Sequence, residues 1–332
     1  NGKTQKELTD LLLNGTSTDV TDFYSSLARS LPTSKDTGVA INSAIRLYID
    51  DSISLRRSYQ KHIEEKYDVK VDNLCLSSAS EATKVINKFI NDATRGKIKN
   101  IFESSGDEDA ILINTVHFFG KWNCFFNPCD TRIRLFNGVD NSRPMDFMKN
   151  RGKFQVTLKN EIGTVLIIPY LDEQYNFFYL MPNESSNIKK LRRTLTGEKL
   201  VSVLRDAKKR NVDIFVPKFK VESKLDGKRV LQKLGVKLMF KDCADLSQIS
   251  STPLKVSKIQ HAAMIETNEE GTIAAAVTIE GFQVMGMFEE EPLPQVIIDR
   301  PFLFGIRRNE DILFIGQFVG QSELDYTDWS LN

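Results

Sequence analysis

Several sequence patterns on which enzymes depend are missing from this chain of 332 residues. It contains no Gly-x-Ser-x-Gly pentad, no Gly-x-x-x-x-Gly-Lys phosphate loop and no Gly-x-Gly-x-x-Gly dinucleotide fingerprint. Histidine is scarce, since only His62, His117 and His261 are present, and no cluster of other reactive residues replaces it. We therefore expect that the chain is not an enzyme and that it needs no cofactor.

Long apolar runs and an excess of one charge are missing too. No stretch of about 18 apolar residues is present, which argues against a membrane span. The 45 lysines and arginines nearly cancel the 44 acidic residues, so the net charge of +1 gives no general attraction to nucleic acid. We expect a monomer that neither spans a membrane nor binds nucleic acid.

Only four cysteines are present, too few to form the main scaffold of a chain of this length. Cys124 and Cys129 do not have zinc-finger spacing, and no histidine pair lies near them, so we expect no metal site. The simplest interpretation is that all four are free thiols. The other two are Cys75 and Cys243.

Two triplets match the acceptor pattern for N-glycosylation. They begin at Asn14 and Asn183. Such sites suit a secreted glycoprotein, which is the location we favour, and a cytoplasmic location is the alternative.

Basic residues gather in two short groups. The groups are Lys189, Lys190, Arg192 and Arg193, and Lys208, Lys209 and Arg210. A polyanion such as heparin is one possible partner for them, and a solvated helix face is the simpler interpretation.

Three segments have helix signals. Thr4 and Glu7 have capping-box spacing ahead of an apolar stripe, and Ser78 and Glu81 repeat that spacing ahead of a second one. The second helix should stop at Arg95 and Gly96. A third, short helix is expected over residues 230–234, before a glycine.

Runs rich in branched and aromatic residues predict strands. They cover residues 110–119, 164–168, 177–181 and 212–216. These strands do not alternate regularly with helices, so the fold class is α+β and not a doubly wound parallel sheet. No repeat or linker divides the chain, which predicts one domain.

The stretch EEGTIAAAVT, from Glu269 to Thr278, is the most informative part of the sequence. Gly271 permits unusual backbone angles, and the residues after it are small or β-branched, uncharged and free of proline. Such a segment can become a strand. The glycines, prolines and acidic residues that follow predict an exposed loop, although an edge strand and its connection would also explain these residues alone.

Together with other segments, this stretch resembles the serpin family. The segments are INTVHFFGKW at 113–122, VPKFKVES at 216–223, LQKLGVKLMFKDCADLS at 231–247, VSKIQHAAMIETNEEG at 256–271 and IIDRPFLFGI at 297–306. The resemblance implies a serpin fold with three β-sheets and about eight or nine helices. It implies a single domain over residues 1–332 and an exposed reactive-centre loop at about 269–294.

The resemblance also implies a mechanism. Serpins hold the loop outside a five-stranded sheet, and a target serine protease that cuts the loop is trapped in a covalent complex as the loop inserts as a new strand. The implied hinge consists of Glu269, Glu270, Gly271, Thr272, Ile273, Ala274, Ala275, Ala276, Val277 and Thr278.

Side chains of an inserted strand alternate between its faces. If Thr272 points inward, the next inward residues are Ala274, Ala276 and Thr278, all small and uncharged. Before cleavage, we expect Thr272 to lie at the exposed base of the loop.

Other residues match named positions of the family. Asn114 and His261 match the shutter, where hydrogen bonding between central strands governs the opening of the sheet. Trp122 matches the tryptophan at the top of the sheet, in the breach. Glu269 and Lys218 match an ion pair there.

The family's usual spacing from Gly271 places the cut between Met285 and Gly286. The alternatives are Met287 and Phe288. Between residues 261 and 299 there is no lysine or arginine, so a trypsin-like pocket, which pairs a carboxylate with a cation, has nothing to bind. The apolar candidates favour a chymotrypsin-like or elastase-like protease.

The main alternative is a non-inhibitory serpin that acts as a binding, carrier or chaperone protein. Ile273 stands where the family usually has glutamate, and Glu280 shares the inward parity of the hinge. Two further departures concern the ends of the chain. It begins where family members reach their third helix, and the tail at 322–332 extends beyond the family's usual end.

Overall fold

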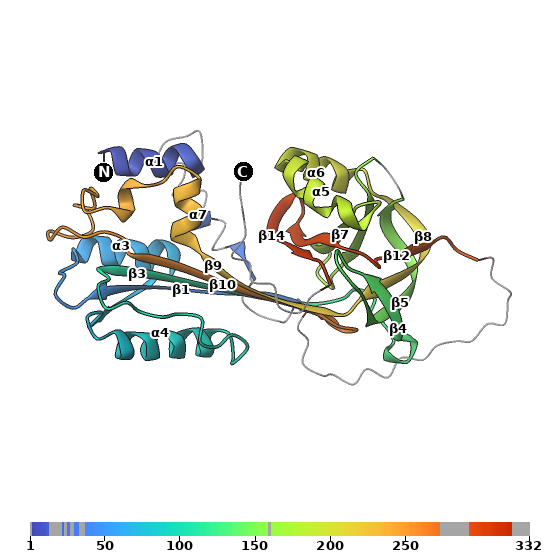
Figure 1. Cartoon of the computed structure of the whole chain (residues 1–332), viewed down its shortest axis with the longest axis horizontal. Helices are drawn as coiled ribbons and strands as arrows, with labels where there is room; N and C mark the ends of the chain where they lie inside the picture. The colour runs from blue at the N-terminus through green and yellow to red at the C-terminus, as the bar shows by residue number, and fades with distance from the viewer. Residues whose placement is uncertain are drawn as a thin grey trace.

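The computed structural model describes residues 2–12, 22, 25–26, 30–32, 37–158, 161–272 and 292–320. Figure 1 shows a long, twisted sheet with helices on both sides, which continues into a second region of strongly curved strands. The described residues contain six α-helices, fewer than the eight or nine expected. These are α1 (Gly2–Leu12), α3 (Arg57–Tyr67), α4 (Ala79–Ala93), α5 (Ile188–Thr194), α6 (Gly197–Arg205) and α7 (Gly227–Lys233).

The long sheet has six strands. In spatial order they are β2 (Lys70–Leu74), β1 (Val39–Asp50), β3 (Ala110–Lys121), β11 (Gly271–Thr272), β10 (Lys258–Thr267) and β9 (Phe219–Asp226). Because β11 has only two residues, β3 and β10 pair directly with each other over most of their length. The sheet therefore has the five strands expected from the resemblance, plus a short strand wedged into its centre.

The second sheet has eight strands. They are β12 (Gln295–Ile297), β8 (Lys208–Pro217), β5 (Ser142–Thr157), β6 (Thr164–Pro169), β7 (Tyr175–Met181), β13 (Phe302–Arg308) and β14 (Asp311–Phe318), with β4 (Arg132–Asn137) on β5. We expected two smaller sheets here. They are joined into one because the 16-residue β5 pairs with β4 over residues 142–147, with β8 over residues 147–156 and with β6 over residues 155–157.

The largest core lies between the two sheets. In β7, alternate side chains serve two clusters: Phe177 and Tyr179 enter the main aromatic core, while Phe178 and Leu180 pack under α5 and α6. The rings of Phe177 and Phe304 are stacked with centroids 5.9 Å apart. Apolar residues on both faces explain why this run is a fully buried strand.

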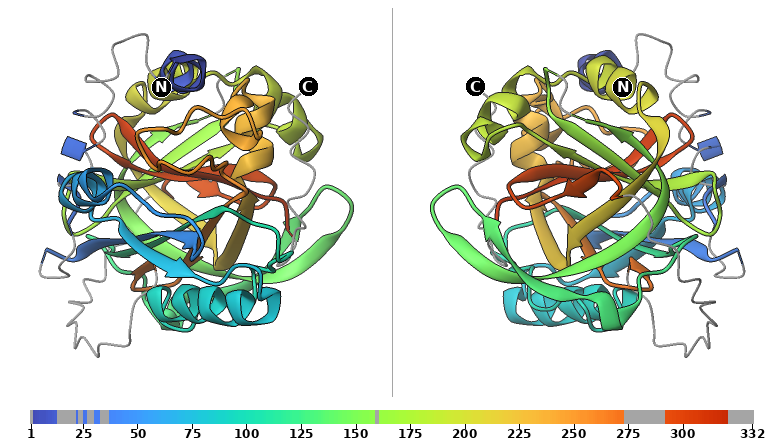
Figure 2. Two further views of the ribbon diagram at one scale, coloured as in Figure 1. Left: turned by 90° about the vertical axis from the view of Figure 1, so that its left-hand side faces the viewer. Right: turned by 90° about the vertical axis from the view of Figure 1, so that its right-hand side faces the viewer.

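Helix α4 covers one face of the long sheet. Ala82, Ile86 and Ile90 are buried against a cluster that includes Ile111 and Ile113 of β3. Figure 2 shows α4 on the side of the sheet opposite α1 and α7. The odd-numbered residues of β3 from 111 to 113 therefore face α4, and the even-numbered ones face the opposite side.

All three predicted helices and all four predicted strand runs are confirmed. The capping interpretation was wrong for the first helix, because it begins at Gly2 and contains Thr4. The Thr4 hydroxyl instead accepts from the Asp245 amide at 3.1 Å, and Glu7 accepts from the amide of Lys237 at 2.7 Å. Ser78 does occupy the N-cap of α4 but makes no side-chain capping bond.

Candidate functional site

The centre of the long sheet is a seam between two parallel strands. Residues 258–264 of β10 pair with residues 111–117 of β3, both running in the same direction. Beyond Met264 and His117 the two strands separate, and β11 lies between them, antiparallel to both. We call this the upper end of the seam, and the end at Lys258 and Ile111 the lower end. Thr272 is paired with Gly120 of β3 and with Thr267 of β10. The start of the predicted hinge thus already occupies the upper end of the seam.

A tight turn directs the chain from β10 into the seam. The side-chain Oδ1 of Asn268 accepts hydrogen bonds from the amides of Glu270 and Gly271, at 3.0 and 3.1 Å. The Asn268 amide donates to the Gly271 carbonyl at 2.9 Å. Asparagine suits this position because its side chain can bond to the backbone two residues further on.

Trp122, which directly follows β3, holds this turn from the side. Its indole Nε1 donates to the Asn268 carbonyl and its amide donates to the Glu270 carbonyl, both at 2.9 Å. The indole is 3% exposed and stacks on Tyr170, with ring centroids 4.8 Å apart. The predicted breach tryptophan therefore contacts the hinge directly.

Two polar contacts anchor the carboxylate of Glu269. Lys218, in the connection between β8 and β9, lies 2.9 Å from Glu269 Oε2, and the Thr131 hydroxyl donates to Oε1 at 2.8 Å. Partial burial favours the neutral carboxyl, but the hydrogen bonds from Lys218 and Thr131 outweigh it and lower the pKa of Glu269. The ion pair implied by the resemblance is present, and it is charged at neutral pH.

Two close contacts at the start of the hinge require glycine, one against the backbone of β3 and one against aromatic rings. A Cβ atom added to Gly271 would lie 1.9 Å from the carbonyl oxygen of Gly120. A Cβ on Gly120 would lie 2.6 Å from the rings of Phe118 and Tyr170. Neither position has room for a larger residue.

Thr272 differs from our expectation of an exposed position. It is fully buried, and its hydroxyl lies 2.7 Å from the hydroxyl of Tyr170. Burial raises the pKa of Tyr170 well above its ordinary value, so this contact is a hydrogen bond between neutral hydroxyls. Sequence reasoning missed Tyr170 and Thr131 because their contacts are long-range and nothing local indicates them. It also missed Asn268, although an asparagine two residues before Glu270 is a local signal for this turn.

Comparison with known proteins decides the family. A family model described as Serpin (serine protease inhibitor) matches residues 1–320. The chain belongs to the serpin family. Iripin-2 of Ixodes ricinus is 31% identical over 331 residues, covering 95% of this chain and 82% of Iripin-2. Serpin B6 of Pongo abelii is 33% identical over 294 residues, covering 85% of this chain and 77% of that protein.

Solved structures agree on the fold. Serpin48, described as a highly specific serpin in the insect Tenebrio molitor, superposes with a TM-score of 0.83 at 26% identity, over 97% of this chain and 86% of Serpin48. Human thyroxine-binding globulin complexed with thyroxine superposes with a TM-score of 0.86 at 24% identity, over 97% of this chain and 87% of the globulin. Serpins are generally protease inhibitors and not enzymes, but the fold alone does not separate inhibitors from carriers.

The predicted shutter residues of this serpin are neighbours across the seam. His261 of β10 is the register partner of Asn114 of β3, and both lie on the face away from α4. Asn114 Oδ1 is buried and has no hydrogen-bond partner among the described residues. Within this part of the chain no side-chain hydrogen bond joins the pair. Burial lowers the pKa of His261, which is therefore neutral at pH 7.

The remaining predicted sites fall mostly outside the described residues. Hinge residues 273–278, the candidate cut residues 285–288, the tail at 322–332 and Asn14 all lie there. Asn183 is exposed, and its glycosylation stays a prediction, as does secretion. The four cysteines are free. In the described ranges, no helix is long and apolar enough to cross a membrane, and no group of side chains suits a metal ion.

We expect His261 to make the serpin's stability depend on pH. A histidine whose pKa is lowered by folding stabilises the protein above its unfolded pKa of about 6.5, and that stability is lost as pH falls. The free energy of unfolding should drop by up to about 1.4 kcal/mol per pH unit below that point. Urea unfolding at pH 7.5 and 5.5 measures it.

His261→Gln should remove most of this pH dependence, whereas His62→Gln, at an exposed position on α3, should keep it. If the free energy of unfolding changes equally with pH in the parent and in His261→Gln, His261 is not the group that causes the pH dependence.

Proposed function

We propose that this serpin inhibits a serine protease by suicide-substrate trapping, in which the cut reactive loop inserts between β3 and β10. The observation that carries the proposal is that β11 already pairs with both strands at the upper end of the seam, through Thr272 with β10 and through Gly271 and Thr272 with β3. Insertion would extend a strand that has begun to form. No change in the direction of the chain is required.

The register of β11 supports a specific expected position for each loop residue. Thr272 pairs with Gly120 and Thr267, so each further residue moves one step down both strands. Ala274 would then stand between Phe118 and Ile265. Ala276 would stand between Val116 and Ala263. These positions are uncharged and closely packed, and they suit small side chains.

The same count brings Thr278 between Asn114 and His261. Its hydroxyl could donate to the buried Oδ1 of Asn114, which has no partner among the described residues. Glu280 would stand between Leu112 and Ile259, where a carboxylate finds only apolar neighbours in the two flanking strands. The inserted strand is therefore well matched down to Thr278 and poorly matched at Glu280.

The chemistry follows from the ordinary action of a serine protease. Its serine oxygen attacks the carbonyl of Met285, the bond to the Gly286 nitrogen breaks, and the new amine takes the proton passed on by the protease's histidine. The serpin remains joined to the enzyme through an ester. Trapping requires that insertion be faster than hydrolysis of this ester.

The absence of lysine and arginine between residues 261 and 299 supports a protease with an apolar pocket. We expect complexes with chymotrypsin-like or elastase-like proteases that survive denaturing electrophoresis, and none with trypsin. Mass spectrometry of the released peptide should show a new amino terminus at Gly286, Phe288 or Glu289. Clean cleavage without complex would instead favour a non-inhibitory serpin, and a cut outside residues 282–291 would overturn the assigned bond.

A charge on the inward face of the loop should turn the inhibitor into a substrate. Thr272→Arg does not test this, because Thr272 is buried before cleavage. Ala276→Arg is suitable, since the guanidinium would have to be buried without a partner between Val116 and Ala263, at a cost of several kcal/mol. An increase of about 1.4 kcal/mol in the activation free energy of insertion already slows it tenfold.

The measurement is the ratio of complex to cleaved serpin in a titration against a protease that the parent inhibits. Ile273→Arg is the matched control, because its side chain would emerge on the other face beside Glu266, which is partly exposed. An unchanged ratio for Ala276→Arg, or an equal loss in both variants, would contradict insertion in this register.

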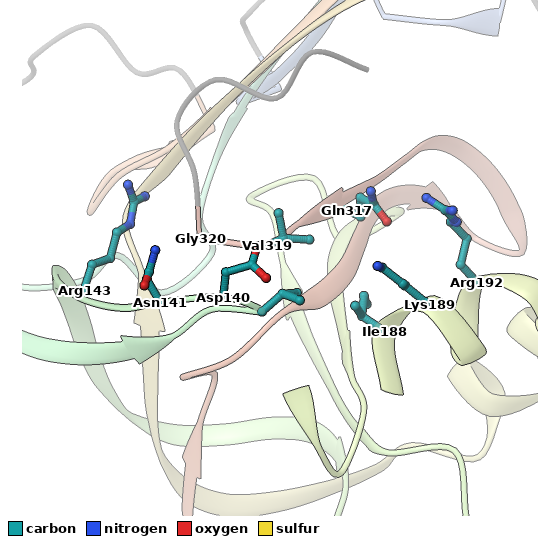
Figure 3. Close-up of a pocket in the computed structure, with 10 residues that line it drawn as sticks. Asp140, Asn141, Arg143, Ile188, Lys189, Arg192, Gln317, Val319 and Gly320 are labelled. Carbon is teal, nitrogen blue, oxygen red and sulfur yellow. The ribbon is translucent and has the colours of Figure 1, made fainter. Parts of the chain in front are cut away.

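We also propose that a sulfated polyanion binds at the basic face of α5. Lys189 and Arg192 line a cavity of about 350 Å³ together with Arg143 of β5, as Figure 3 shows. Asp140 lies in the same cavity and reduces its positive potential. The second basic group, residues 208–210, is exposed at the start of β8 and not on a helix.

Heparin affinity chromatography tests this site. Lys189→Glu combined with Arg192→Glu should weaken binding about tenfold or more, since four units of charge change at one cavity. Lys208→Glu combined with Lys209→Glu changes the same charge at the other group and should have a smaller effect. If only the second pair matters, the site lies on β8. If the parent does not bind, the proposal fails.

A further inference from the structure

A dense polar network closes the lower end of the seam, opposite the end that holds the hinge. Lys258, the first residue of β10, lies 2.6 Å from Oε1 of Glu108, in the segment that leads into β3. The same ammonium donates to the carbonyl of Glu103 at 2.8 Å and to the hydroxyl of Ser105 at 3.2 Å. One cation thus joins β10 to three groups of the segment before β3.

The carboxylate of Glu108 is fully bonded although it is buried. Its side chain is 1% exposed and accepts from the hydroxyls of Ser104 and Ser105, at 2.8 and 2.7 Å, and from the amides of Ser105 and Gly106. Burial favours the neutral acid, but the bonds from Lys258, Ser105 and Ser104 outweigh it and lower the pKa of Glu108 to about 2.

Three backbone amides add further hydrogen bonds between the start of β10 and the start of β3. The Asp109 amide donates to the hydroxyl of Ser257 at 2.9 Å, and the Ser257 amide donates to the carbonyl of Ala110 at 2.8 Å. The Lys255 amide donates to Asp109 Oδ2 at 3.1 Å. We call residues 103–110 and 255–258, with these contacts, the lower clasp.

The register places the lower clasp in the path of the inserting loop. Counting down from Thr272, Gly281 would come beside Lys258, and Val284 would come beside Glu108. Residues 282–285 would therefore occupy the space that the clasp now bridges. A strand that ends at Thr278 stops opposite Asn114 and leaves the clasp intact.

We propose that the Glu108–Lys258 clasp is a second barrier to insertion, distinct from the shutter, which must open before the last residues of the loop can enter. This inference rests on the proposed trapping function. Opening the clasp separates a buried carboxylate from its cation, and such a separation is costly. The clasp therefore sets how fast the final part of the strand forms and how much cleaved serpin escapes trapping.

Two synthetic peptides separate the clasp from the rest of the seam. The long peptide, IAAAVTIEGFQVM, copies residues 273–285, and the short one, IAAAVT, copies residues 273–278. Both start directly below Thr272, but only the long one reaches the clasp. Their rates of annealing to the intact serpin are followed by native electrophoresis and mass spectrometry.

Glu108→Gln removes the charge and should speed annealing of the long peptide about tenfold while leaving the short one unchanged. Ser105→Ala removes one bond to Glu108 and one to Lys258, and should act in the same direction if Glu108→Gln fails to fold. Glu65→Gln, in the exposed Lys61–Glu65 pair of α3, is the matched control and should change neither rate.

Equal acceleration of both peptides would mean general loosening of the sheet and would overturn the proposal, as would an unchanged rate for the long peptide. Annealing needs no protease. If clasp-dependent annealing occurs without any protease complex, the trapping function fails and the clasp stands. If proteases are trapped but the annealing rate of the long peptide does not depend on Glu108, the clasp proposal fails and the trapping function stands.

Discussion

The direct pairing of β3 with β10 is the constraint on which the rest of this serpin depends. The two strands run parallel, while each is antiparallel to its outer neighbour, β1 or β9. A parallel pair is slightly less stable per residue than an antiparallel one, and one strand antiparallel to both converts a single parallel ladder into two antiparallel ladders. A segment of the right direction could therefore replace the direct pairing of β3 and β10 with two antiparallel ladders. The hinge has that direction, because the turn at Asn268 sends β11 back along β10.

The upper end of the seam combines close packing with polar anchoring. Gly271 allows a backbone contact with Gly120 that no larger residue permits, and Gly120 leaves room for the rings of Phe118 and Tyr170. The Trp122 and Tyr170 rings cover this contact from the side. These features hold the first hinge residues in the sheet without holding the residues that follow. A side chain at Thr272 thus belongs to the folded core before any cleavage, and this is why a substitution there would test stability and insertion together.

The sequence predicted the elements whose signal is local. Strand β3 and helix α4 carry long apolar patterns, and both were found where expected. Strand β1, which reads VAINSAIRLYID, was missed because polar residues interrupt its pattern, and α3 was missed because only Ile63 of its eleven residues is buried. The resemblance to serpins supplied the pairing of Glu269 with Lys218, which composition alone could not. The contacts of the hinge and of the lower clasp join segments about 50 to 150 residues apart in the sequence. A periodic pattern within one segment gives no indication of such contacts.

The distribution of charge along the seam bears on how the proposed insertion could open it. An ion pair stands at each end, the partly buried Glu269 with Lys218 at the upper end and the buried Glu108 with Lys258 at the lower end. Between them the face away from α4 is uncharged at neutral pH, because its central polar pair is Asn114 and a neutral histidine. Charged groups resist separation in a poorly solvated site, so the two ends fix the register, whereas the middle is held by strand hydrogen bonds that an incoming strand can replace one for one. Resistance to opening is therefore concentrated at the ends. The upper end is already occupied by the hinge, so in the proposed mechanism the lower end is the place where insertion would meet its remaining electrostatic cost.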